Sequence, residues 1–255
     1  MRSALQHEAP ASASRAKVEL IDTAQIPNGG HLRLLRCGAD YSIQFGEDEL
    51  MGSEAAQSEE ALAWLAVRRI GTECGRMLIG GLGMGFTLGA ALEALPKNAS
   101  VVVAELVPKV VEWASGPLAH LFGNTLEDPR VSIVIGDVHD VIVASPRRFD
   151  AILLDVDNGP DGFIRAENDR LYCNWGLRAA YASLRPGGVL AIWSAYDDEA
   201  FFSRLAQAGF LVDTAKVTDA GGRERAPYTI WLASRPEDDP VRDDIATSLG
   251  ASPLN

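Results

Sequence analysis

The chain has 255 residues, of which 47% are hydrophobic, and it carries a formal net charge of -12. This length allows one large hydrophobic core with a small appendage. The negative charge would repel nucleic-acid phosphates and anionic lipid headgroups, so we expect neither nucleic acid nor membrane as a partner. No apolar run approaches the roughly twenty residues that span a bilayer, and we expect a cytoplasmic protein.

Both ends of the chain lack the patterns of regular structure. Residues 1–16 are rich in Ala, Ser and charge without apolar periodicity, which predicts a disordered N-terminus. Residues 236–255 contain an acidic run and few apolar positions, which predicts an acidic, flexible C-terminal tail.

The first patterned region is residues 17–56. From residue 31 to residue 51, apolar and polar side chains alternate on both sides of Gly38, which predicts a small N-terminal β-hairpin unit. Residues 58–69 follow as a predicted helix, with Ser58 as its N-cap and two acidic residues in its first turn.

Residues 57–235 alternate short apolar runs with helical segments, which predicts a doubly wound, mostly parallel α/β sheet. The expected parallel strands are residues 77–79, 101–104, 131–135, 151–154 and 189–193. Residues 211–217 and 228–233 are joined by a loop too short for a crossover helix, so we expect an antiparallel hairpin at one sheet edge.

A glycine-rich turn follows the first of these strands, where Gly81, Gly83 and Gly85 form a G-x-G-x-G motif. Glu105 ends the next strand, where an acid can accept hydrogen bonds from both ribose hydroxyls of a nucleoside. Phe86 occupies the position at which a dinucleotide fingerprint needs a third small residue, which disfavours NAD. The pattern is typical of class I S-adenosylmethionine (AdoMet) enzymes and predicts an AdoMet-transferase-like catalytic domain.

Acids also follow two later strands. Asp137 could accept a hydrogen bond from an adenine amino group, or it could only form the turn after its strand. Asp155 and Asp157 stand where a transferred group would meet its acceptor, and Asp155 is the candidate catalytic base. The alternative is that both belong to an ordinary loop. The cysteines and histidines lack the spacing of a metal site, so we expect no metal.

These motifs, in this order, resemble the spermidine synthase (polyamine aminopropyltransferase) family over about residues 45–234. The resemblance places Gly81 to Gly85 at the family's G-G-G-D-G loop and Glu105 at its ribose-binding acid. Asp137 corresponds to the adenine-side aspartate, and Asp155 to the catalytic aspartate. The resemblance implies a Rossmann-like class I AdoMet-transferase fold, a nucleoside cosubstrate and a homodimer paired through the N-terminal unit.

The departures from the family lie on the acceptor side of the expected site. Met84 replaces the aspartate that receives the amine of decarboxylated AdoMet. Ser58 and Glu59 stand where the family has Tyr and then His or Gln. The segment 155–160 is two residues shorter than its counterpart, and 161–170 is longer. The resemblance therefore covers the nucleoside half of the site better than the polyamine half.

Three functions remain open on the sequence. The one that the sequence slightly favours is methyl transfer from intact AdoMet to a small acceptor, with Asp155 orienting or deprotonating the nucleophile. The second is a divergent aminopropyltransferase that uses decarboxylated AdoMet, in which Glu59, Asp157 and Asp161 replace the lost amine contact and the negative charge suits a cationic acceptor. The third is a nucleoside-binding protein without catalysis.

Five tryptophans could form a cage for a cation, but their scattered positions predict core packing instead. They are Trp64, Trp113, Trp175, Trp193 and Trp231. Trp193 is the exception to consider, because it ends a predicted strand beside the site.

Overall fold

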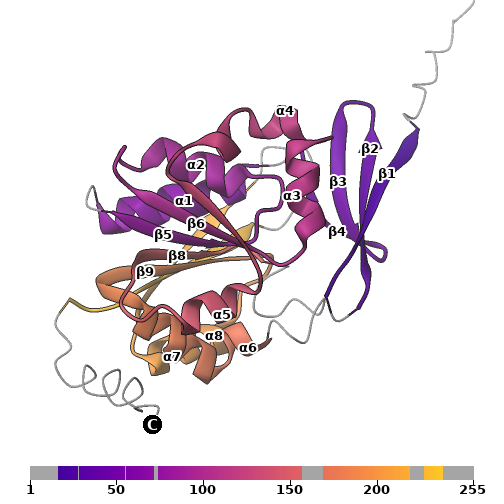
Figure 1. The fold of residues 1–255 in the computed structure, drawn as a ribbon. Coiled ribbons are helices and arrows are strands. Elements are labelled where there is room, and N and C mark those ends of the chain that lie inside the picture. The colour runs from indigo at the N-terminus through magenta and orange to yellow at the C-terminus, as the bar shows by residue number, and fades with distance from the viewer. Residues whose placement is uncertain are drawn as a thin grey trace, which may run out of the picture.

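The computed structural model describes residues 17–27, 29–54, 56–71, 74–156, 169–218 and 227–237. It shows a small antiparallel sheet standing beside a larger sheet that helices cover on both faces (Figure 1). No helix within these described ranges is long and apolar enough to cross a membrane.

The small sheet has four antiparallel strands in sequential order. Its strands are β1 (Val18–Gln25), β2 (His31–Cys37), β3 (Asp40–Phe45) and β4 (Asp48–Gly52). The predicted hairpin is present as β2 and β3, in which buried Leu34 lies opposite buried Ile43. β1 was not predicted from the sequence, because seven of its eight residues are exposed or only partly buried and the alternation is weak.

The large sheet has seven strands in the order β10-β11-β9-β8-β5-β6-β7. They are β5 (Arg76–Gly80), β6 (Ser100–Glu105), β7 (Val131–Ile135), β8 (Phe149–Leu154), β9 (Leu184–Ser194), β10 (Leu211–Val217) and β11 (Tyr228–Ser234). The first five pair in parallel, while β11 runs antiparallel to both β9 and β10. This confirms the predicted fold class, including the antiparallel hairpin at one edge.

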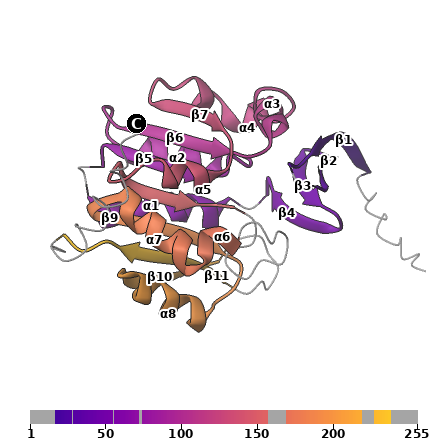
Figure 2. The same cartoon turned by 60° about the horizontal axis from the view of Figure 1, so that its bottom comes forward.

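Helices enclose this sheet as two layers, which Figure 2 shows after a turn of the molecule. The helices are α1 (Gln57–Ile70), α2 (Phe86–Ala94), α3 (Pro108–Ser115), α4 (Ala119–Phe122), α5 (Val138–Val143), α6 (Asp169–Tyr172), α7 (Asn174–Ser183) and α8 (Glu199–Ala208), with a 3-10 turn at Thr125–Glu127. Met77 and Ile79 of β5 pack into a core with α1, α2 and α3, while Leu78 between them packs into a second core with α5, α7 and α8. The alternation follows from the two-residue period of a strand.

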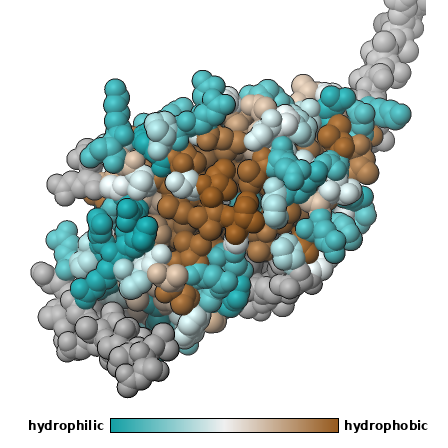
Figure 3. All heavy atoms as spheres, viewed as in Figure 1, coloured by the Kyte–Doolittle hydropathy of each residue, from teal (hydrophilic) through white to brown (hydrophobic). Residues whose placement is uncertain are grey.

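β7 forms one edge of the large sheet, and its apolar side chains Val134 and Ile135 are exposed. The face of the molecule seen in Figure 1 carries apolar side chains over its middle (Figure 3). At the other side of that face, the small sheet is fastened to α3, because the Trp113 Nε1–H donates to the Asp22 carboxylate at 2.9 Å.

The predicted N-cap of the first helix is wrong. α1 begins at Gln57 after Ala56, and no side chain caps it. Ser58 lies inside the first turn, where it is buried and its hydroxyl donates to the Glu59 carboxylate at 2.9 Å. The helix begins two residues earlier than the sequence pattern suggests, and Ser58 lies in its first turn as a buried residue.

Core packing holds for three of the five tryptophans. Trp113, Trp193 and Trp231 are buried, whereas Trp64 and Trp175 are 45% and 56% exposed. Trp64 is exposed because α1 turns a different face to the core, the one that carries buried Leu62, Ala63 and Ala66.

Candidate active site

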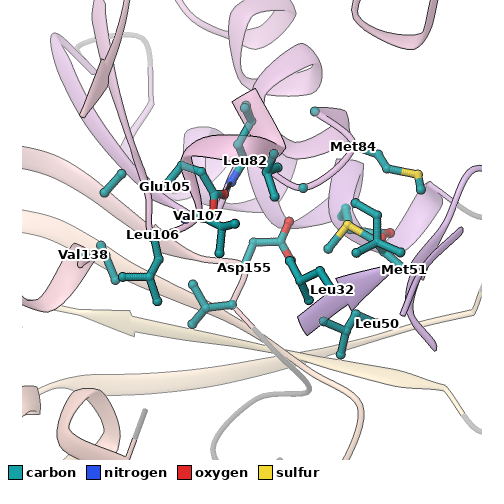
Figure 4. A pocket seen from close by; sticks show the side chains of 18 of the residues that line it. Leu32, Leu50, Met51, Leu82, Met84, Glu105, Leu106, Val107, Val138 and Asp155 are labelled. Carbon is teal, nitrogen blue, oxygen red and sulfur yellow. Dashed lines mark hydrogen bonds between the residues drawn. The ribbon is translucent and has the colours of Figure 1, made fainter. Parts of the chain in front are cut away.

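A cavity opens where the carboxyl ends of β5, β6, β7 and β8 meet the small sheet (Figure 4). This is the edge at which parallel α/β sheets bind their ligands. Every sequence-predicted site residue within the described ranges lines this cavity; these residues are Glu59, Gly81, Gly83, Gly85, Glu105, Asp137 and Asp155. Asp157 and Asp161 lie outside the described residues. The fold therefore gathers side chains that are up to 96 positions apart in the sequence.

The glycine loop is shaped by close packing against the protein itself. Gly81 has a φ of 89°, and a β-carbon there would lie 2.3 Å from the backbone oxygen of Asp155. Gly83 has a φ of 52°, and its β-carbon would lie 2.8 Å from the Met51 sulfur of the small sheet. Both positions favour glycine, because other residues avoid this backbone region, and at Gly81 the Asp155 backbone also leaves no space for a side chain. The Asp155 backbone therefore packs directly against the loop.

Glu105 is buried at the end of β6, where it holds the loops on either side. Its carboxylate accepts hydrogen bonds from the Leu82 N–H at 2.9 Å and the Val107 N–H at 2.8 Å. Burial raises the pKa of Glu105, although these backbone hydrogen bonds oppose that shift. The Leu106 and Gly83 N–H groups also lower the pKa of Glu105, so backbone donors surround this carboxylate.

Asp137 lies between the cavity and α5, which it caps. One carboxylate oxygen accepts from the His139 N–H at 2.8 Å, and the other accepts from the Arg170 guanidinium of α6. The turn-forming function that the sequence left open for Asp137 is therefore present. The Arg170 contact was missed, because no pattern in the sequence links positions 33 residues apart.

Asp155 directly follows β8, and its carboxyl is partly buried beside the glycine loop. The Thr87 hydroxyl, from the first turn of α2, donates to Asp155 Oδ2 at 2.6 Å. Burial raises the pKa of Asp155 to about 6, while the Thr87 hydrogen bond acts in the opposite direction. A carboxylate with a pKa in this range is mostly ionised at neutral pH and still accepts a proton readily, which suits a general base.

Thr87 lies behind the cavity lining and bonds Asp155, a contact that sequence reasoning missed. It is 3% exposed, and its hydroxyl oxygen lies 3.2 Å from the backbone oxygen of Glu59 as well as close to Asp155. The only signal was its place just after the glycine loop, where a helix begins. A threonine there is common enough to carry no specific message.

Apolar side chains line both ends of the cavity (Figure 4). Glu105 and Val138 are at one end, Asp155 is central, and Met51, Met84 and Leu50 are at the other end. Met84, which the resemblance places at the position of an aspartate, is 2% exposed and belongs to the hydrophobic core. The small sheet thus contributes apolar side chains to the site.

Ionisable side chains of one sign line the cavity. Among the described lining residues they are Glu59, Glu105, Asp137 and Asp155, and none is basic. This arrangement favours a cationic ligand over an anionic one. Across the described part of the chain, no three His, Cys, Asp or Glu side chains gather as a metal ion would require.

Trp193, at the end of β9, also lines the cavity. Its ring packs against Tyr228 of β11 with a centroid distance of 4.9 Å. Its Nε1–H is buried without a hydrogen-bond partner among the described residues. Trp193 is therefore both a buried residue and part of the cavity wall.

Comparison with known proteins finds similar proteins of the family that the motifs resemble. No protein-family model matches the chain. The polyamine aminopropyltransferase of Mycobacterium tuberculosis is 31% identical over 134 residues, which are 48% of this chain and 25% of that protein. The polyamine aminopropyltransferase of Korarchaeum cryptofilum is 28% identical over 108 residues, 42% of this chain and 32% of that protein. The matched segments thus span a third or less of these relatives.

Solved structures extend the likeness to most of the chain. The spermidine synthase from Thermotoga maritima superposes with a TM-score of 0.68 at 18% identity, over 92% of this chain and 84% of that one. A spermidine synthase in complex with the transition-state analogue AdoDATO gives a TM-score of 0.70 at 18% identity, over 92% of this chain and 85% of that one. The protein therefore has the fold of the spermidine synthases, and over about half of its length its sequence is similar to that of polyamine aminopropyltransferases.

Proposed function

We propose that the protein is a transferase that binds decarboxylated AdoMet and moves its aminopropyl group to the nitrogen of a small amine. The observation that carries this proposal is the acidic lining of the cavity, with four carboxylates and no basic side chain among the described residues. A sulfonium nucleoside and an amine are both cationic. The carboxylate of intact AdoMet would add a negative charge beside these acids, which is unfavourable.

The relatives support the same choice. The sequence alone slightly favoured methyl transfer, whereas the proteins similar in sequence are named polyamine aminopropyltransferases. One of the structures with this fold holds the transition-state analogue AdoDATO. We therefore infer aminopropyl transfer, and methyl transfer becomes the second candidate.

The nucleoside half of the cavity offers suitable hydrogen-bond partners. Glu105 lines the cavity at the end of β6, where its carboxylate would accept the ribose hydroxyls in competition with the backbone N–H groups that it now binds. Asp137 lies nearby for the adenine amino group, which would share this carboxylate with Arg170. These residues would hold the donor substrate, which supplies an electrophilic carbon and a thioether leaving group.

Asp155 would act as the general base. It accepts a proton from the acceptor ammonium, and the nitrogen lone pair this releases forms the new N–C bond. The C–S bond breaks at the same carbon, and its electron pair stays on sulfur, which becomes neutral. Glu59, which lines the same cavity from α1, would attract a second ammonium group and so replace the aspartate that Met84 has displaced.

Calorimetric titration tests the choice of donor. Purified protein is titrated under one buffer condition with AdoMet, decarboxylated AdoMet, S-adenosylhomocysteine and methylthioadenosine. We expect tighter binding of the decarboxylated pair. Tighter binding of the carboxylated pair would overturn the proposal in favour of methyl transfer, which buried Met84 at the amine-binding position favours. Failure of all four to bind would refute the nucleoside site.

Asp155→Asn tests the base. We expect this variant to lose aminopropyl transfer while its nucleoside affinity stays unchanged. Asp213→Asn makes the same chemical change on β10 at a 61% exposed side chain outside the cavity, and it serves as the matched control. Full turnover in Asp155→Asn would show that another group takes the proton.

A further inference from the structure

A buried hydroxyl lies between two acidic residues of the cavity. Thr87 Oγ1 is 2.6 Å from Asp155 Oδ2 and 3.2 Å from the backbone oxygen of Glu59. A hydroxyl has one proton, so it donates fully to only one of these two acceptors at a time. Which acceptor it serves depends on whether Asp155 itself carries a proton.

We propose that Thr87 is a positioning residue for Asp155, whose hydroxyl turns from the Asp155 carboxylate to the Glu59 carbonyl when Asp155 takes up a proton. This inference rests on the proposed function only for the source of that proton. It assigns Thr87 to the site, although neither the sequence motifs nor the resemblance pointed to it.

Two hydrogen-bond arrangements follow from the distances. While Asp155 is ionised, the Thr87 O–H donates to Oδ2. After proton transfer, the Asp155 O–H donates to Thr87 Oγ1, and the Thr87 O–H donates to the carbonyl of Glu59. Each arrangement pairs every proton, so neither state leaves a buried polar group unsatisfied, which would be costly. Both arrangements use the contact between Thr87 Oγ1 and Asp155 Oδ2, so the protonated state carries its proton on Oδ2.

Three different elements hold these groups in place. Thr87 lies in the first turn of α2, and Glu59 lies in α1. The Asp155 N–H donates to the Gly80 oxygen at 3.0 Å, and the Asp155 backbone packs against Gly81. A β-branched threonine has few side-chain rotamers available in a helix, so the position of its Oγ1 atom is fixed while the O–H bond can rotate. The proton changes position while the heavy atoms stay where they are.

Other acidic side chains line the same cavity as Asp155, and removing the Thr87 hydroxyl does not change them. Within the described lining they are Glu59, Glu105 and Asp137, which all carry negative charge when ionised. The hydrogen bond from Thr87 lowers the pKa of Asp155, and substitutions of Thr87 leave these other acids in place. Variants that remove only the hydroxyl therefore isolate its contribution.

The test compares Thr87→Val, which keeps the shape and removes the hydroxyl, with Thr87→Ser, which keeps the hydroxyl. The carboxyl pKa of Asp155 is measured by carbon-13 NMR on protein labelled at aspartate carboxyls, and Asp155→Asn identifies the signal. We expect the pKa of Asp155 in Thr87→Val to lie about one pH unit higher, because a charge-assisted hydrogen bond is lost. Thr87→Ser should restore the wild-type value.

Kinetics provide the second readout. In Thr87→Val, the acid limb of kcat for aminopropyl transfer should move upward with the pKa, and KM for the nucleoside should stay within about twofold. Thr229→Val is the matched control. Thr229 of β11 is also buried, but it accepts a hydrogen bond from Lys216 of β10 and lies outside the cavity lining. It should leave the pKa of Asp155 unchanged.

The outcomes separate this inference from the proposed function. An unchanged pKa in Thr87→Val would overturn the inference even if transfer is observed. Thr87→Ser behaving like Thr87→Val would overturn it too, because the lost methyl packing would then explain the effect. If the wild-type protein transfers no aminopropyl group, the proposed function fails, while the NMR titration still decides whether Thr87 controls Asp155.

Discussion

Replacing Asp155 by asparagine should stabilise the protein in neutral and mildly alkaline solution, although it removes the candidate base. The reason is burial, which raises the pKa of Asp155 to about 6 from an ordinary value of 3.8. A raised pKa means that the folded state resists ionising this carboxyl. Asparagine has nearly the same shape, carries no charge, and offers an oxygen that can accept the Thr87 hydroxyl proton.

The magnitude follows from proton linkage. The folded pKa lies about two units above the unfolded value, and each unit corresponds to about 1.4 kcal/mol. The free-energy cost of ionising Asp155 in the folded protein is absent below about pH 4, where the carboxyl is protonated in both states. This cost grows as the pH rises through about 6. Asp155→Asn should therefore gain at most about 3 kcal/mol in free energy of unfolding at about pH 8, and little at about pH 4.

Urea unfolding of the wild type and the variant at both pH values measures this difference. Asp128→Asn is a control of opposite sign, because hydrogen bonds from Arg130 lower the pKa of Asp128 to about 2. That variant should be less stable than the wild type at about pH 8, and the difference should shrink as the pH falls from about 5 to about 2. An Asp155→Asn effect that is equal at both pH values would refute the burial argument.

Three further changes probe the loop and the cavity. Glu105→Ala leaves two backbone N–H groups without an acceptor and should lower the free energy of unfolding by about 2–4 kcal/mol, with weaker nucleoside binding by calorimetry. Gly81→Ala should lose about 2 kcal/mol or more in urea unfolding, because its methyl group would collide with the Asp155 backbone. Met84→Asp should raise affinity for decarboxylated AdoMet relative to methylthioadenosine, by about tenfold in calorimetry, by supplying a partner for the amine.

Each of these has a result that contradicts it. Wild-type stability in Glu105→Ala would mean that the two N–H groups find other partners. An unaffected Gly81→Ala would mean that the loop can move away from β8. An unchanged ratio of affinities in Met84→Asp would place the amine elsewhere in the cavity.

The central strands of the large sheet were predictable because they are buried on both faces. All six residues of β8, Phe149–Leu154, are buried, and its last four residues appear in the sequence as a continuous apolar run. The helix at residues 58–69 was predictable from its period, but its N-cap was not. Capping depends on the direction from which the chain enters the helix, and at Ser58 that direction comes from the preceding small sheet.

Long-range contacts within the site were not predictable. Asp137 and Arg170 are 33 residues apart, and Thr87 and Asp155 are 68 apart, with no shared pattern to connect them. Met51 of the small sheet packs over Gly83 in the loop after β5, and this contact also joins segments that are far apart in the sequence. Each contact depends on how helices and sheets pack after they have formed.

The sequence by itself determined the order of strands and helices, the glycine loop and the acids that end the strands, because these depend on local periodicity and on residues close together in the chain. Tertiary structure decided which of those acids share one cavity, that apolar side chains line both of its ends, and that a buried threonine bonds the candidate base. The physical reason is that burial, proton affinity and hydrogen-bond partners belong to a packed environment, and the segments that create it lie far apart in the sequence.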